Sequence, residues 1–283
     1  MGKQPSSSNT ARRRAVVATT VLSHGQRDGA GSQVIHRSMR ILRMLASSPS
    51  EGETIANMSE YLGLTHSTTY RIIKALEREG VVQRTHGTRH YTIGPELVWL
   101  GLGAYPKIPV ALAANPALKQ LSKEVGDSVF LAVRSGFDSV YVDRLLGSYP
   151  VQEVELCIGS RRPLGVNVAG RAILGFLPED AMRSIVEANA ARYSAFSSST
   201  DIVLRDAALA RRRGYIWNDS LTAPDRRVLA APILDISGSA VAAVCIIARQ
   251  YRLSETRIAT IVPALLEAAK TASRNLIEAS RKD

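Results

Sequence analysis

The sequence predicts an α+β protein built from two domains and an N-terminal tail. The chain has 283 residues and 45% hydrophobic content, which is enough to form two separate cores. Residues 33–94 read as short amphipathic helices followed by a hairpin, whereas residues 115–283 mix short β runs with helical segments. Residues 1–32 are rich in Ser, Thr, Gly and Arg, and we expect them to form a disordered basic tail.

Three helices are predicted in the N-terminal domain. The first runs from Gln33 to Ser47, with an expected inward face of Ile35, Met39, Leu42 and Leu45 and an outward face of Arg37, Arg40 and Arg43. The other two are shorter and are separated by a tight turn at Gly63. Helical spacing gives their inward faces, which are Ile55, Met58 and Leu62 in the second helix and Ile72, Ile73 and Leu76 in the third.

The third helix is predicted to present a polar and cationic face. Thr65 is well placed to cap its first turn. The residues left facing outward are Ser67, Thr68, Tyr70, Arg71 and Lys74. Such a face is typical of the second helix of a helix-turn-helix, which enters the major groove of DNA. An ordinary helical hairpin with a solvated charged face has the same spacing, so the helices alone leave both interpretations open.

A basic hairpin after these helices favours DNA binding. Val81–Thr85 is predicted to form one strand, His86–Gly87 the turn, and His90–Ile93 the returning strand. The hairpin carries Arg84 and Arg89, and cationic side chains in this place suit contact with phosphates or with the minor groove. We therefore interpret residues 33–94 as a winged helix-turn-helix domain.

Charge and cysteine content point to a polyanionic partner and a reducing compartment. The formal net charge is +11 and the pI is about 10.0. Residues 1–104 hold 13 Lys and Arg against 7 Asp and Glu, so this part is the more basic per residue. The only cysteines are Cys157 and Cys245, which form no disulfide framework, and no segment approaches a membrane span. A cytoplasmic location is expected.

Residues 95–114 are predicted to form a linker region that contains a helix from Glu96 to Ala104. Its apolar residues are Leu97, Val98, Leu100 and Leu102. A free linker would expose them to water, so we expect this helix to be buried against a second copy of itself in a dimer.

The C-terminal domain, residues 115–283, is predicted to be an antiparallel sheet flanked by helices. Asn115 is expected to cap, and Pro116 to open, a helix that ends at Gly126. Strands are expected at 128–134, 140–145, 151–157, 215–217, 228–236 and 240–248. Further helices are expected at 169–177, 178–190, 202–213 and 254–279, the last with a kink or local break at Pro263.

Several ordered segments resemble the IclR family of bacterial transcriptional regulators. The run from Gly63 to Ile73 is similar to the family's G-L-x-x-S-T-x-x-R-[LI]-[LI], and Tyr91–Gly94 resembles its Y-x-[LI]-G. Residues Gly159–Ala172 resemble its G-x-x-x-P-L-H-x-T-A-x-G-[KR]-A, and the segments 213–219 and 230–233 resemble the surroundings of its effector cavity. The resemblance implies a GAF-like C-terminal domain that binds a small organic effector, often an aromatic or organic acid. It also implies dimers or tetramers on palindromic operators.

Departures from the family pattern predict a more apolar cavity. Gly165 replaces a usual His, Asn167 a frequent Thr, Cys245 and Ile247 frequent serines, and Val228 a frequent Cys, while Ser220-Leu221 replace an acidic pair. These exchanges favour a ring-bearing effector. The predicted lining is Leu164, Val166, Asn167, Asp219, Val228 and Cys245, with Asn167 and Asp219 as polar anchors. A carboxylate could be received by Arg161, Arg162 or backbone N–H groups near Gly170, although the two arginines could equally form a solvated turn.

Catalysis is not expected. No His follows His90, so neither Cys157 nor Cys245 has a neighbouring imidazole base in the C-terminal domain, and a Ser-His-Asp triad is ruled out there. His86 and His90 have no nearby Cys to complete a metal site, and no cofactor is expected. Two functions remain: a regulator controlled by an effector, and a DNA-binding protein whose C-terminal domain serves only for oligomerisation.

Overall fold

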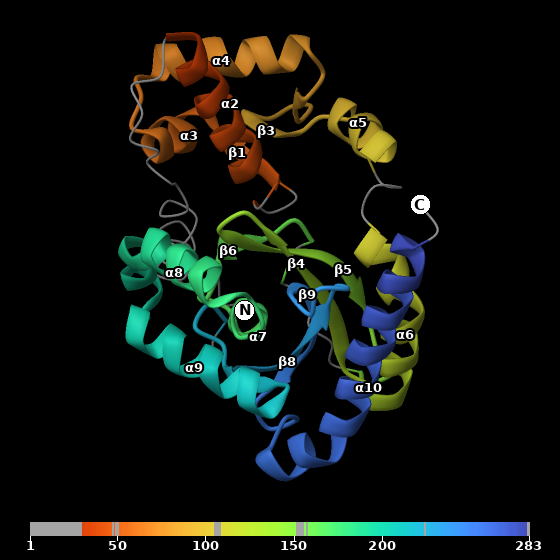
Figure 1. The fold of residues 1–283 in the computed structure, drawn as a ribbon. Coiled ribbons are helices and arrows are strands. Elements are labelled where there is room, and N and C mark those ends of the chain that lie inside the picture. Colours follow the sequence, from red (N-terminus) through yellow and green to blue (C-terminus); the bar gives the residue numbers. More distant parts are fainter. Residues whose placement is uncertain are drawn as a thin grey trace, which may run out of the picture. The chain divides into compact units, whose positions relative to one another are not determined.

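The computed structural model describes residues 30–46, 48, 51–104, 109–150, 156, 158–223 and 225–281. The chain divides into two compact units, Met1–Lys107 and Ile108–Asp283 (Figure 1). Residues 1–29 of the predicted tail, most of the predicted strand at 151–157, and Cys157 lie outside the described residues.

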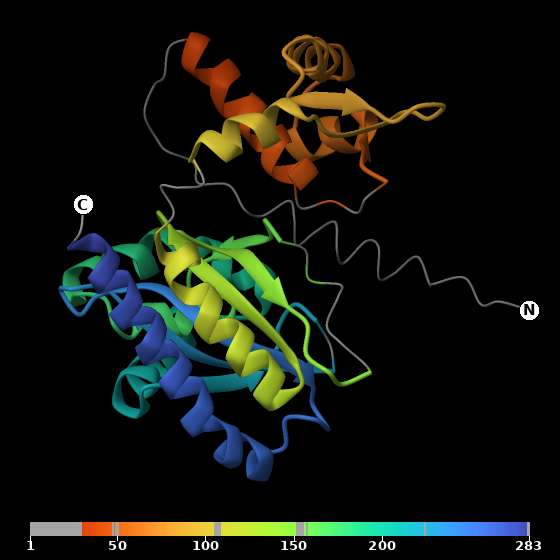
Figure 2. The same cartoon turned by 90° about the vertical axis from the view of Figure 1, so that its right-hand side faces the viewer.

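The first unit is a winged helix-turn-helix. Its elements are α2 (Ala30–Ala46), β1 (Glu53–Thr54), α3 (Ile55–Leu62), α4 (His66–Arg78), β2 (Val82–Arg84), β3 (His90–Ile93) and α5 (Glu96–Ala104). The strands form an antiparallel sheet in the order β1-β3-β2, and Figure 2 shows the β2–β3 hairpin extending away from the helices. The predicted helices and wing are confirmed, whereas β1 was not predicted because two residues carry no alternation that could be recognised.

Local side-chain chemistry fixes the helix ends in this unit. The hydroxyl of Thr65 accepts a hydrogen bond from the Thr68 amide at 3.3 Å, which confirms the predicted cap of α4. Gly63 ends α3 with φ +64°, a left-handed conformation that glycine adopts without strain. The turn between the two helices is therefore encoded in the sequence.

The inward face predicted for the first helix was partly wrong. Ile41, Met44 and Leu45 are buried, whereas Ile35 and Met39 are 66% and 41% exposed. The helix carries apolar residues on two adjacent faces, and periodicity alone cannot decide which of them packs against α3 and α4.

Arg40 was also predicted to point outward, and it does not. Its guanidinium lies 5.4 Å from the centre of the Tyr61 ring and donates to the Tyr61 carbonyl at 3.1 Å. The long aliphatic stem of arginine allows such packing at the edge of a core.

The second unit is a six-stranded antiparallel sheet between two helical layers. Its strands are β4 (Ser128–Ser135), β5 (Asp138–Leu145), β6 (Arg161–Pro163), β7 (Ile216–Asp219), β8 (Arg226–Leu234) and β9 (Ala240–Arg249). Its helices are α6 (Pro109–Val125), α7 (Val168–Leu174), α8 (Glu179–Tyr193), η2 (Ser194–Phe196), α9 (Thr200–Arg213) and α10 (Glu255–Ser280). The strand order is β6-β5-β4-β9-β8-β7.

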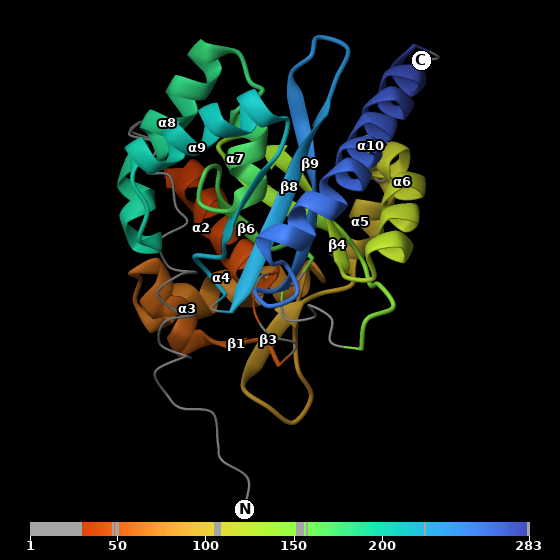
Figure 3. The ribbon, with the colours of Figure 1, turned by 90° about the horizontal axis from the view of Figure 1, so that it is seen from below.

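The two faces of this sheet are covered by different helices, as Figure 3 shows. Helices α6 and α10 pack on one face, where Leu131, Leu229 and Val244 belong to one apolar core. Helix α7 packs against β8 and β9, and α8 and α9 lie beside it. Because side chains alternate along a strand, neighbours such as Phe130, Val228 and Cys245 face the α7 layer.

The start of the helix at Pro116 differs from the prediction. Helix α6 begins at Pro109, so Asn115 is not a cap, and its side-chain amide instead donates to Asp143 at 3.3 Å. Pro116 lies inside α6, and Pro263 lies inside α10 without ending it. The packing of α6 against α10 compensates for the hydrogen bonds that proline removes.

In the part of the chain that the structure describes, no helix is long and apolar enough to cross a membrane.

Candidate DNA-binding surface and effector site

The residues predicted to contact DNA share one face of α4. Ser67, Tyr70 and Arg71 are exposed, Thr68 and Lys74 are half-buried, and Thr69 is fully buried behind them. Among the described residues, the Arg71 guanidinium has no hydrogen-bonding or ion-pair partner, so its five donors remain available for a base or phosphate.

Two of the predicted cations already interact within the domain. Lys74 donates a hydrogen bond to the Glu77 carboxylate at 2.6 Å, and this bond raises the pKa of the lysine. In the wing, Nε of Arg84 donates to the Thr88 carbonyl at 2.8 Å, which closes the hairpin turn. Arg89 is exposed, and within the described residues no partner holds it.

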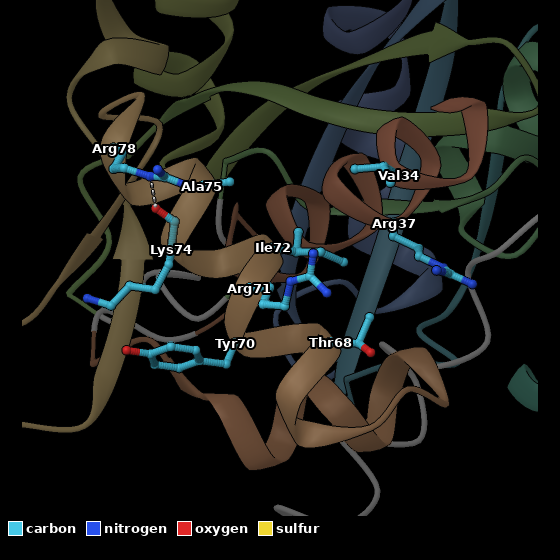
Figure 4. A pocket seen from close by; sticks show the side chains of 9 residues that line it. All are labelled: Val34, Arg37, Thr68, Tyr70, Arg71, Ile72, Lys74, Ala75 and Arg78. Carbon is cyan, nitrogen blue, oxygen red and sulfur yellow. Dashed lines mark hydrogen bonds between the residues drawn. The ribbon is translucent and has the colours of Figure 1, made fainter. Parts of the chain in front are cut away.

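An open groove of about 460 Å³ runs between α2 and α4 (Figure 4). We call it the α2–α4 groove, and it is lined by Val34, Arg37, Thr68, Tyr70, Arg71, Ile72, Lys74, Ala75 and Arg78. The sequence prediction included four of these residues but missed Arg37, because spacing along α2 does not reveal that this residue lies across from α4.

Five of the six predicted effector residues lie in or beside the α7 layer. Leu164 and Val166 are buried, as are Val228 and Cys245. Asn167 caps α7, and its Oδ1 accepts hydrogen bonds from the Gly170 amide at 2.8 Å and from the Ser139 hydroxyl at 3.0 Å. Its Nδ2 is buried and makes no hydrogen bond of good geometry, although the side chain interacts with the Tyr141 hydroxyl and thereby lowers the pKa of that tyrosine.

The sixth residue, Asp219, faces the other side of the sheet. It is paired in register with Arg227, binds that guanidinium at 2.7 Å, and its side chain is 52% exposed. Asn218 is paired with Val228 and therefore faces the α7 layer, where its amide donates to Asp206 at 3.0 Å. The predicted convergence of Asp219 with the other five does not occur, because neighbouring residues of a strand point to opposite faces.

A polar group that the sequence prediction missed lies beside Asn167. The Tyr141 ring is buried and packs edge to face on Phe130 at 5.6 Å. Burial raises the pKa of Tyr141 well above its usual value, and the nearby Cys245 raises it further, whereas Arg162 and Asn167 oppose the rise. The predicted strand at 140–145 contained Tyr141, but its facing could not be assigned without the register.

The charge states in this region argue against nucleophilic chemistry. Burial raises the pKa of the Cys245 thiol far above its usual range, so it stays protonated. Burial lowers the pKa of Arg162, while Tyr141 raises it. We call Tyr141, Arg162, Asn167 and Cys245 the polar cluster.

Arg161 and Arg162 are not a solvated turn. Both belong to β6, and Arg161 binds Asp138 at 3.1 Å. Register places Arg162 opposite Ser139, on the face that Tyr141 shares. Arg162 is thus the arginine that lies with Asn167 and Tyr141.

A DNA-reading domain joined to a sheet domain with a buried polar cluster defines a transcriptional regulator. Residues 34–86 match the IclR helix-turn-helix domain, and residues 103–274 match the family described as bacterial transcriptional regulator IclR C-terminal. The chain belongs to the IclR family of bacterial transcriptional regulators, whose relatives are regulators rather than enzymes.

Curated relatives cover most of this chain. It is 26% identical to the HTH-type transcriptional regulator BhcR of Paracoccus denitrificans, over 92% of each chain. It is 29% identical to the probable transcriptional regulator SauR of Cupriavidus necator, over 82% of this chain and 92% of that one. It is 25% identical to the transcriptional repressor IclR of Escherichia coli, over 84% and 88%.

Solved structures share the fold. An IclR transcriptional regulator from Alicyclobacillus acidocaldarius superposes with a TM-score of 0.70 and 21% identity, covering 86% of this chain and 98% of its own. An IclR homologue from Microbacterium hydrocarbonoxydans, crystallised with 4-hydroxybenzoate, gives a TM-score of 0.64 at 19% identity and the same coverage.

Proposed function

We propose that this regulator binds operator DNA in the cytoplasm as a dimer or tetramer, and that a small aromatic acid controls its operator affinity or activity. The single observation that carries the effector assignment is the buried Nδ2 of Asn167, which lies beside the Tyr141 hydroxyl and makes no hydrogen bond of good geometry. A buried donor without a well-placed acceptor is costly, so an oxygen of a bound ligand is a fitting partner for it.

The surroundings of Asn167 favour an anion attached to a ring. Arg162 and the Tyr141 hydroxyl supply further donors, and Asp219 lies on the other face of the sheet. Leu164, Val166, Val228 and Cys245 supply apolar walls, which suit an aromatic ring. The bound 4-hydroxybenzoate of the Microbacterium homologue makes aromatic acids the first class to test.

For DNA, we propose the contact residues Ser67, Thr68, Tyr70, Arg71 and Lys74 on α4 and Arg84 and Arg89 on the wing. Arg71 and Arg89 are the strongest candidates, because the structure gives neither guanidinium a partner within the described residues. Arg84 and Lys74 would have to share their existing hydrogen bonds with the nucleic acid.

Calorimetry tests the effector assignment. Wild-type protein is titrated with benzoate, 4-hydroxybenzoate, acetate and succinate, and we expect saturable heat with an aromatic acid. Asn167→Asp retains an oxygen that can cap α7 but replaces the amide donor with a negative charge. It should weaken binding about tenfold or more, since a hydrogen bond to a charged group contributes about 1.5–3 kcal/mol.

Two results would contradict the effector assignment. Unchanged affinity for the acid in Asn167→Asp would mean that the Asn167 amide does not contact the effector. The matched control is Asp219→Asn, on the other face of the sheet, which should leave the affinity unaltered. Absence of saturable heat with every acid would favour a C-terminal domain that serves only for oligomerisation.

A further inference from the structure

The α2–α4 groove has a cationic rim that the recognition helix alone does not explain. Of its nine lining residues four are Arg or Lys, and none is acidic. Val34 and Arg37 come from α2, and the others come from α4 (Figure 4). The groove therefore lies between two helices, and only one of them was predicted to contact DNA.

The three arginines at the rim are available to a ligand. Arg71 and Arg78 lie two turns apart on α4, with Ala75 between them in the same row. Arg78 uses only its Nε, which donates to the Lys74 carbonyl at 3.3 Å. Arg37 faces them from α2, and within the described residues it donates one weak hydrogen bond, to the Gln33 side chain at 3.4 Å. Both terminal nitrogens of Arg78 thus remain free for a further acceptor within the described residues.

The floor of the groove is apolar. Val34, Ile72 and Ala75 contribute it, and the Tyr70 ring lies at one side. An open channel with a carbon floor and cations along both sides matches the sugar-phosphate backbone, whose deoxyribose carbons and phosphates repeat along a strand. The groove is also continuous with the face of α4 that carries Thr68 and Arg71.

We propose that one strand of the duplex read by α4 lies along the α2–α4 groove, with Arg37 and Arg78 contacting its phosphates. This inference rests on the proposed DNA binding and adds α2 to the interface. The two arginines position the duplex, and they act on any sequence because phosphates are the same in all of them.

Binding to a duplex of random sequence, followed by fluorescence anisotropy over a series of salt concentrations, tests the proposal. Arg37→Ala and Arg78→Ala should each reduce the magnitude of the slope of log K against log salt by about 0.9. This is the contribution of one phosphate contact, which releases condensed counterions from the DNA. Arg37→Lys should keep most of the slope, because it retains the charge. Arg43→Ala is the matched control, since Arg43 is exposed on α2 but does not line the groove.

The outcomes separate this inference from the proposed function. If the wild-type protein shows no salt-dependent DNA binding, DNA binding itself is wrong. If it binds DNA but Arg37→Ala and Arg78→Ala both give the same salt slope as Arg43→Ala, the DNA backbone does not lie in the groove. If the two variants instead change the molecular mass in light scattering and leave the salt slope unaltered, the groove holds a second copy of the chain and the proposal is overturned.

Discussion

At the scale of single residues, a buried ion pair holds the segment beside the polar cluster. Arg171 on α7 and Asp206 on α9 are 2.6 Å apart, and each side chain is only 4% exposed. Nε of Arg171 also donates to the Gly165 carbonyl at 2.8 Å. Burial lowers the pKa of Arg171, and the Asp206 charge opposes that effect. The pair thereby ties the loop before α7 to two helices.

Removing one partner of this pair should be strongly destabilising. We expect Arg171→Met to lower the free energy of unfolding by about 3–5 kcal/mol, because Asp206 would keep a buried charge with less compensation. Urea denaturation measures the loss. Arg183→Met is the control: Arg183 pairs with Glu179, but both side chains are more than half exposed. That change should cost at most about 1 kcal/mol, and equal losses in the two variants would contradict the argument.

The polar cluster offers a second test at this scale. Cys245→Ser adds a stronger hydrogen-bonding group on the face that Val228 and Phe130 share. If the proposed effector site is correct, calorimetry should show a shift toward more polar acids of about 0.5–1.5 kcal/mol, the contribution of one hydrogen bond. An unaltered ranking of the acids would place the effector away from Cys245.

The sequence predicted which segments contribute to the site better than it predicted which face of the sheet each side chain occupies. The motif around Asn218 and Asp219 was recognised, but only the register shows that Asn218 rather than Asp219 faces α7. A shift of one position in a strand reverses the face, and no periodic signal resolves it in a strand of four residues. Tyr141 was missed for the same reason.

At the scale of elements, α4 and the wing are expected to contribute differently to DNA binding. Arg71→Ala should lose about 1–3 kcal/mol on a preferred site selected from random duplexes, if its guanidinium reads a guanine, and less on random DNA. Anisotropy on both duplexes gives the comparison. Equal losses on the two would mean that Arg71 contacts the backbone and not a base.

Arg89→Ala provides the contrasting case. Arg89 lies at the end of the wing turn, just before β3, so its expected contact is a phosphate. Affinity should fall for all sequences alike, and the salt dependence should flatten by about one unit of slope. A loss confined to the preferred site would instead assign Arg89 a role in reading sequence.

Elements with strong periodicity or clear caps were predictable. The cap of α4 and the β8–β9 hairpin follow from local chemistry, as Thr65 and the turn at Gly238 illustrate, whereas the cap of α7 by Asn167 was not predicted. Helix α6 begins earlier than predicted, because packing against α10 outweighs the usual preference of Pro116 for a helix start. Short strands such as β6 form because they pair with a neighbouring strand. Three residues are too few to show the alternation that would predict a strand.

At the scale of the whole molecule, an apolar surface on α5 has no partner within the described part of the chain. Val98, Trp99, Leu100 and Leu102 are between 54% and 61% exposed. Apolar side chains gathered at this density on a surface helix usually mark a protein interface. We therefore predict that this helix is buried against a second copy of itself in a dimer.

Charges placed on this surface test the expected assembly. Trp99 and Leu102 lie three residues apart and share one side of α5, so Trp99→Asp with Leu102→Asp would bring four carboxylates into a twofold seam. Desolvating these carboxylates would cost more free energy than the apolar contacts of the interface contribute. Light scattering should therefore report a shift toward monomers. Ile236→Asp is the matched control, since Ile236 is equally exposed but lies in the turn between β8 and β9. If the α5 variant keeps the parental mass, or if Ile236→Asp dissociates the protein just as well, the assembly is not held by α5.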